Sequence, residues 1–136
     1  MKKKKLQLVD IPFGDTTLKV PAIVGHSYVP IRALPLEELN TKFSEHRRLR
    51  VFHHKGLECV SCDKVGVYLL IARDRGGAVH VDLYTKDFEL MTIDHIKPKG
   101  KGGSNEIENL DPMCSTCNTR KADKYEEEEE TQEENN

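Results

Sequence analysis

Four cysteines in two pairs have the clearest metal-binding spacing in this chain. Cys59 and Cys62 form one Cys-x-x-Cys, and Cys114 and Cys117 form the second. Each pair suits a tight turn in which two thiolates converge on one ion, and four thiolates complete a tetrahedral zinc site. Disulfides are the alternative, but no apolar signal segment follows Met1, so we expect zinc. Four cysteine ligands leave no open position for water or substrate, which predicts a structural zinc.

A second group of residues, Asp94, His95 and Asn118, has the chemistry for catalysis. The Asp-His pair ends the apolar run from Leu90 to Ile93, and Asn118 directly follows the last cysteine. A carboxylate and an amide supply two hard oxygens, the donors that magnesium prefers while it keeps waters and takes phosphate oxygens from a substrate. His95, on the other side of the strand from Asp94, could deprotonate water near neutral pH. These residues suit a one-metal phosphodiesterase site, although an Asp-His pair alone is more often structural.

The elements that must position these residues run in the order strand, loop, helix. The strand covers 90–93, and the Gly- and Lys-rich loop 97–109 permits the backbone turns that a packed segment would not. Its glycine spacing does not match a phosphate-binding P-loop. Residues 115–124 suit a short helix. Upstream, 65–73 and 78–85 are rich in β-branched residues and predict an antiparallel hairpin that the strand at 90–93 extends.

The first half of the chain predicts short strands and then a helix. The strands are expected at Leu6 to Ile11 and Thr17 to Val20. Residues 36–55 place apolar side chains near helical spacing, with acids early and bases late, and Gly56 suits the end of the helix. This helix carries three arginines that either contact a DNA backbone or form a solvated face: Arg47, Arg48 and Arg50.

Composition predicts one small domain with a modestly basic folded part. The chain has 136 residues, 37% of them hydrophobic and none of them Trp, so the core is small and a bound metal is a suitable staple. The net charge is −2, but the last eleven residues hold seven acids, and the rest carries 21 bases against 16 acids. This balance fits a phosphate-bearing partner. No apolar run is long enough to cross a bilayer, so no membrane partner is expected.

The order of these motifs resembles the HNH endonuclease family, the ββα-metal or His-Me finger nucleases. The resemblance covers Arg47 to about Lys121 and depends on RRLRVFHHKGLECVSC and TIDHIKPKGKGGSNEIENLDPMCSTCNTRK. It implies an α+β fold, namely a small zinc-stapled ββα-metal domain preceded by a basic helix and short N-terminal strands. The expected divisions are an N-terminal extension (1–35), the HNH nuclease domain (36–124) and an acidic disordered tail (125–136).

The resemblance also implies a role for each residue of the site. His95 is the general base, Asp94 and Asn118 hold a catalytic Mg²⁺ or Mn²⁺, and Asn109 fixes the loop that orients His95. The four cysteines match the structural zinc ligands of many members. The family often has His at the position of Asn118. An amide oxygen can still bind a metal, so this departure bears on metal preference more than on activity.

The implied function is hydrolysis of phosphodiester bonds in DNA, leaving 5′-phosphate and 3′-hydroxyl ends. Basic residues near the site in sequence are expected to hold the DNA backbone, together with the three arginines: Lys97, Lys99, Lys101, Arg120 and Lys121. A double-strand cut would need two copies of the chain or two visits. A small stand-alone chain of this kind suits a phage or mobile element, and we expect a cytoplasmic location, in the host if the chain is phage-encoded.

Two other functions are compatible with the same residues. The first is a catalytically silent zinc-stapled nucleic-acid-binding module, which the basic helix would serve equally well. The presence of Asp94, His95, Asn109 and Asn118 argues against it, since a pure binding module does not need all four. The second is an interaction protein whose acidic tail recruits a partner or mimics DNA.

Overall fold

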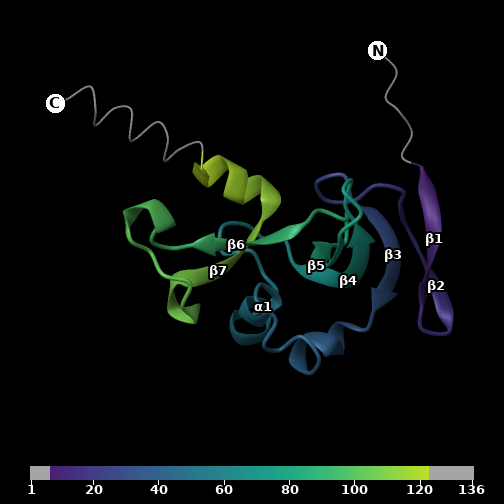
Figure 1. The fold of residues 1–136 in the computed structure, drawn as a ribbon, viewed down its shortest axis with the longest axis horizontal. Helices are drawn as coiled ribbons and strands as arrows, with labels where there is room; N and C mark the ends of the chain where they lie inside the picture. Colours follow the sequence, from purple (N-terminus) through teal and green to yellow (C-terminus); the bar gives the residue numbers. More distant parts are fainter. Residues whose placement is uncertain (1–6, 123–136) are drawn as a thin grey trace, which may run out of the picture.

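The computed structural model describes residues 7–122, which form a five-stranded sheet, a two-stranded sheet and two short α-helices (Figure 1). The acidic tail predicted at 125–136 lies outside these residues. Within them, no helix is long and apolar enough to span a membrane.

The larger sheet contains strands from both halves of the chain. In spatial order it consists of β2 (Thr16–Pro21), β1 (Leu8–Phe13), β3 (Val29–Leu34), β4 (Gly66–Arg73) and β5 (Val79–Thr85). Neighbouring strands are antiparallel, except that β1 and β3 run parallel and meet at the single pair Phe13 and Ala33. The β4–β5 pairing confirms the predicted hairpin, and β1 and β2 lie where the two N-terminal strands were expected.

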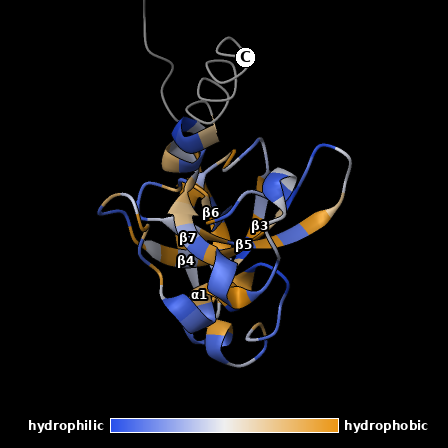
Figure 2. Ribbon diagram, turned by 90° about the vertical axis from the view of Figure 1, so that its left-hand side faces the viewer, coloured by the Kyte–Doolittle hydropathy of each residue, from blue (hydrophilic) through white to orange (hydrophobic). Residues whose placement is uncertain are grey.

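Each face of the sheet packs against its own group of buried side chains, because successive strand residues point to opposite faces. Leu69 of β4 packs with Leu49 and Phe52 of the helix α1 (Leu49–Lys55). The next residue, Leu70, packs with Ile11 in the group that includes β1 and β2. Hydrophobic residues accordingly lie along the central strands (Figure 2). The first group also contains Cys59 and Cys114, so the predicted zinc ligands belong to the core of this half.

The single helix predicted over 36–55 is wrong in length. Residues 36–40 form a short 3₁₀ helix, η1 (Leu36–Asn40), turns follow, and α1 begins only at Leu49. The side chain of His46 begins α1, because its Nδ1 accepts the backbone N–H groups of Arg48 and Leu49, each at 3.3 Å. Side chains that bond to nearby backbone in this way compete with a continuous helix. Gly56 does end α1, with a φ of 99° that favours glycine.

The prediction that the strand at 90–93 extends the hairpin is also wrong. This strand, β6 (Met91–His95), belongs to the separate two-stranded sheet, and an isolated bridge between Tyr84 of β5 and Leu90 lies just before it. It pairs instead with an antiparallel strand that was not predicted, β7 (Leu110–Cys114), in which Pro112 lies opposite Ile93. The order is therefore strand, loop, strand, helix, where residues 115–122 form the described part of the predicted helix.

Candidate active site and metal centre

The four cysteine thiols come together in one cluster. Cys59 and Cys62 lie in the turn after α1, Cys114 ends β7, and Cys117 lies in the helix at 115–122. Their sulfur atoms all lie within 4.8 Å of one another, and Cys62 Sγ is 3.8 Å from Cys114 Sγ. Four sulfurs at about 2.3 Å from one tetrahedral zinc would be about 3.8 Å apart. The cysteines are free rather than disulfide-bonded, and the cluster is consistent with a structural zinc.

Glu89 attaches the helix at 115–122 to the rest of the domain. Its Oε1 accepts hydrogen bonds from the backbone N–H of Thr116 at 2.9 Å and from the hydroxyls of Ser115 and Thr116, while Oε2 pairs with Lys64. Burial alone would raise the pKa of this carboxyl, but the hydrogen bonds from Lys64, Thr116 and Ser115 lower it to about 2. A charged carboxylate at a helix N-terminus is stabilising.

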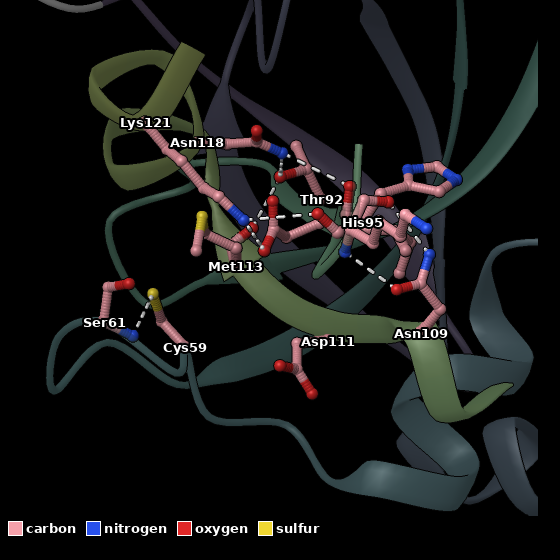
Figure 3. Close-up of polar contacts among 12 residues, drawn as sticks. Cys59, Ser61, Thr92, His95, Asn109, Asp111, Met113, Asn118 and Lys121 are labelled. Atoms are coloured by element: carbon pink, nitrogen blue, oxygen red, sulfur yellow. Dashed lines mark hydrogen bonds and ion pairs between the residues drawn. The ribbon is translucent and has the colours of Figure 1, made fainter. Parts of the chain in front are cut away.

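Asp94 and His95 end β6 beside this helix. Asp94 is buried, with 7% of its surface exposed, and its Oδ2 is 2.6 Å from the ammonium nitrogen of Lys121. The same ammonium group donates to the backbone carbonyl of His95 at 3.2 Å (Figure 3). A buried carboxylate is stable only with such a partner, so this position favours a cation.

Asn118 extends from the helix towards β6. Its amide nitrogen donates to the hydroxyl of Thr92 at 2.7 Å and to the carbonyl of Ile93 at 3.3 Å. The Thr92 hydroxyl in turn donates to the carbonyl of Met113 on β7. Because its nitrogen is held by β6, the carbonyl oxygen of Asn118 faces away from that strand (Figure 3).

Three of the four predicted catalytic residues, Asp94, His95 and Asn118, line one open pocket of about 230 Å³, whereas Asn109 does not line it. Its walls are Asp94, His95, Pro98, Lys99, Asn118, Lys121 and Ala122. The carboxylate of Asp94 and the carbonyl oxygen of Asn118 are hard donors that suit Mg²⁺ or Mn²⁺. The Lys121 ammonium lies 2.6 Å from Asp94 Oδ2, so a divalent ion would have to displace it from this carboxylate. The pair of a carboxylate oxygen and an amide oxygen nevertheless fits such an ion.

Asn109 closes the loop between β6 and β7 onto its own start. Its Oδ1 accepts the backbone N–H of Lys97 at 2.8 Å, and its amide nitrogen donates to the carbonyls of Lys97 and Ser104. Gly103 makes this closure possible, since a Cβ there would lie 1.7 Å from the Lys97 carbonyl oxygen. Asn109 thus holds the backbone immediately after His95, whose neighbour Ile96 donates its N–H to the Asn109 carbonyl.

A residue that the sequence interpretation did not identify, Asn105, contacts His95 directly. The Nε2 atom of His95 is 2.8 Å from Asn105 Oδ1. Asn105 lies in an irregular loop, where neither periodicity nor a motif assigns it a partner. Only the geometry of the closed loop brings it to the histidine.

Several of the predicted DNA-contacting residues also make contacts within the protein. Arg48 contacts Asp82, Arg50 contacts the Asn105 carbonyl, and Lys121 contacts Asp94. Burial raises the pKa of Asp82, which the Arg48 guanidinium opposes. The other basic residues present exposed side chains: Arg47, Lys97, Lys99, Lys101 and Arg120.

Comparison with known families agrees with this geometry. Residues 80–124 match the HNH endonuclease family model. This segment contains β6, β7 and the helix that follows, and therefore Asp94, His95, Asn109 and Asn118. No curated protein and no solved structure matches the chain. The chain thus contains a domain of the HNH endonuclease family over residues 80–124.

Proposed function

We propose that this protein is a metal-dependent DNA endonuclease. The observation that carries the proposal is that β6 and the helix at 115–122 bring Asp94, His95 and Asn118 around one pocket. The antiparallel pair β6–β7 followed by this helix suits the ββα-metal arrangement. On this proposal the nuclease domain covers 36–124 and follows an N-terminal extension. The two parts share one sheet, because β3 of the extension pairs with β4 of the nuclease domain.

His95 acts as the general base. It takes a proton from the attacking water while the water oxygen bonds to phosphorus and the bond from phosphorus to the 3′-oxygen breaks. The leaving 3′-oxygen takes a proton from solvent, so the products are a 5′-phosphate and a 3′-hydroxyl. Asp94 and Asn118 would hold a Mg²⁺ or Mn²⁺ ion, which when bound stabilises negative charge on the leaving oxygen.

The exposed basic side chains near the site hold the DNA backbone. Lys97 and Lys99 lie in the loop beside His95, and Arg120 lies on the helix that carries Asn118. Phosphate contacts of this kind release counterions, so DNA binding weakens steeply as salt rises.

A nicking assay on supercoiled plasmid DNA tests the proposal. Zinc-loaded protein, with about one zinc per chain, is incubated with Mg²⁺, Mn²⁺ or EDTA. The wild type is compared with His95→Ala, and with His54→Ala as a control because His54 is an exposed histidine on α1. Nicking should require the divalent ion and His95 but not His54. Activity that survives His95→Ala, or folded wild type that never nicks, contradicts the proposal.

One contact favours the alternative of a silent nucleic-acid-binding module. Lys121 already neutralises Asp94, at 2.6 Å, and a protein that binds no catalytic ion needs such a partner. Magnesium-independent DNA binding without cleavage under any divalent ion would support this alternative over the nuclease.

A further inference from the structure

The imidazole of His95 is held by a side chain that does not line the pocket. Asn105 Oδ1 lies 2.8 Å from His95 Nε2. We propose that Asn105 is a positioning residue that keeps His95 in the tautomer with its proton on Nε2, and that Arg50 holds Asn105 in place. This inference rests on the proposed function, in which His95 is the general base.

The chemistry of the two groups determines the tautomer. A carbonyl oxygen only accepts hydrogen bonds, and a neutral imidazole has one N–H and one lone pair. Because Nε2 faces the Asn105 oxygen, Nε2 carries the proton and Nδ1 keeps the lone pair. A base receives a proton through its lone pair, so Nδ1 is the atom that takes the proton from water. Partners that fix a histidine in this way also fix the orientation of its ring.

Asn105 is suited to this role because the backbone on both sides of it is held. Asn109 donates to the carbonyl of Ser104 at 2.8 Å, and the Ser104 hydroxyl accepts the N–H of Glu106 at 3.3 Å. Arg50 reaches across from α1 and donates to the carbonyl of Asn105 itself at 2.6 Å. The exposed loop is thereby fixed at the residue that contacts His95.

Arg50 differs in this respect from the neighbouring Arg47. The Arg50 side chain is half-buried and also donates through Nε to the Arg47 carbonyl at 3.3 Å, whereas the Arg47 side chain is exposed. Because the Arg50 guanidinium donates to the Asn105 carbonyl, it holds the loop in the position where Asn105 contacts His95. Arg47 is the matched control, since its role on the proposed function is to contact DNA phosphate.

Nitrogen NMR of the histidine rings tests the tautomer without relying on activity. Full-length, zinc-loaded protein labelled with ¹⁵N-histidine is recorded at a pH where histidine is neutral, with His95→Ala to assign the signals. Wild type should show the Nε2–H pattern for His95, with a proton slow to exchange with solvent. That slow exchange should be lost in Asn105→Ala and in Arg50→Met, and kept in Arg47→Met.

Kinetics of nicking then test the consequence for catalysis. Asn105→Ala should lower kcat about 10- to 100-fold, as for other residues that orient a catalytic histidine, with little change in KM. Asn105→Asp keeps an oxygen acceptor and should restore most of the lost kcat. Arg50→Met should lower kcat in the same direction, whereas Arg47→Met should act mainly by raising KM, as expected for the loss of a phosphate contact. Zinc content and circular dichroism check that each variant is folded.

The two tests separate failure of this inference from failure of the proposed function. If wild type does not nick, the proposed function fails and the NMR result alone decides the role of Asn105. An Nδ1–H pattern in wild type, or an unchanged His95 signal in Asn105→Ala, overturns the inference even in an active nuclease. So does loss of activity in Asn105→Asp equal to that in Asn105→Ala, because the amide nitrogen would then be the group that matters.

Discussion

At the scale of single residues, Lys121 is the side chain whose position has the clearest functional consequence. Its ammonium group contacts both the Asp94 carboxylate and the His95 carbonyl. A divalent ion on Asp94 must compete with this ammonium group, because both are attracted to the same carboxylate. The affinity of the site for the ion therefore depends on how tightly Lys121 is held.

Replacing Lys121 with Met should make the nuclease easier to activate by metal. We expect the Mg²⁺ concentration that gives half-maximal nicking to fall roughly three- to tenfold, which corresponds to losing one competing ion pair of about 1 kcal/mol. The titration is done at saturating DNA, because Lys121 can also affect DNA binding. Arg120→Met is the control. A half-activating concentration that rises would mean that Lys121 organises Asp94 for the metal instead of competing with it.

The residues of the site differ in how far the sequence could predict them. The two Cys-x-x-Cys pairs, the Asp94-His95 dipeptide and Asn118 beside Cys117 are recognisable from local spacing along the chain. The contacts of Asn105 and Arg50 depend on the closed form of a loop that Asn109 and Gly103 fold back on itself. No local pattern encodes that path, so their roles could not be predicted.

At the scale of the elements, the start of α1 depends on one histidine. The Nδ1 lone pair of His46 accepts two backbone N–H groups, and burial, together with Arg48, lowers the pKa of His46 below 6.5. A proton on Nδ1 would abolish both hydrogen bonds. The folded state therefore binds this proton less readily than the unfolded state.

The stability that His46 contributes should fall as the pH falls below about 6.5. Above that value both states hold a neutral ring and the contribution is complete; below it the unfolded state gains the proton first and is favoured. His46→Asn keeps a side-chain oxygen for the helix start and has no titrating ring. Denaturant unfolding at several pH values should show a steeper loss of stability in acid for wild type than for His46→Asn. Parallel curves for the two proteins would contradict this assignment.

The two wrong predictions of secondary structure have local physical reasons. Hydrophobic spacing over 36–55 resembled one helix, but the Nδ1 of His46 accepts backbone N–H groups and starts a separate helix after the turns that follow η1. In β7, Pro112 obscured a short strand, because proline cannot donate to a ladder. The carbonyl of Pro112 accepts the N–H of Val60 in the cysteine turn, so it bonds outside the β6–β7 pair. The missing N–H of the proline is therefore tolerated at this position. The hairpin β4–β5 was predictable because its two strands and turn are contiguous.

At the scale of the whole molecule, the four-cysteine cluster connects the parts that carry the candidate site, and a zinc ion bound there would link them. The cysteines lie in the turn after α1, at the end of β7 and in the final helix, and two of them are buried in the core with Leu49 and Met113. Without the ion, no bond would hold the four thiols together, and the segments that carry them would lose this connection. The core group on the other face of the five-stranded sheet, which contains Ile11 and Leu70, should depend less on zinc, because it contains no cysteine.

Removing zinc should abolish nicking even when Mg²⁺ is supplied in excess. Structural zinc binds with apparent free energies of about 10–16 kcal/mol, which is comparable to the 5–15 kcal/mol that is roughly the whole stability of a domain. We expect chelation to lower the unfolding temperature sharply, as followed by circular dichroism, and zinc addition to restore both folding and nicking. A chelated protein that keeps its unfolding temperature and its activity would show that the cysteine cluster is not a staple.

The strand β7 joins the two centres through a fixed length of chain. It begins directly after Asn109, which fixes the loop behind His95, and it ends at Cys114, a member of the four-cysteine cluster. One inserted or deleted residue would turn every following side chain to the opposite face of the strand. It would therefore misplace the zinc ligand and the loop together. We expect an inserted or deleted residue to disturb the site less in the 74–77 turn than in β7. The five residues of β7 set the spacing between the cysteine cluster and the loop behind His95.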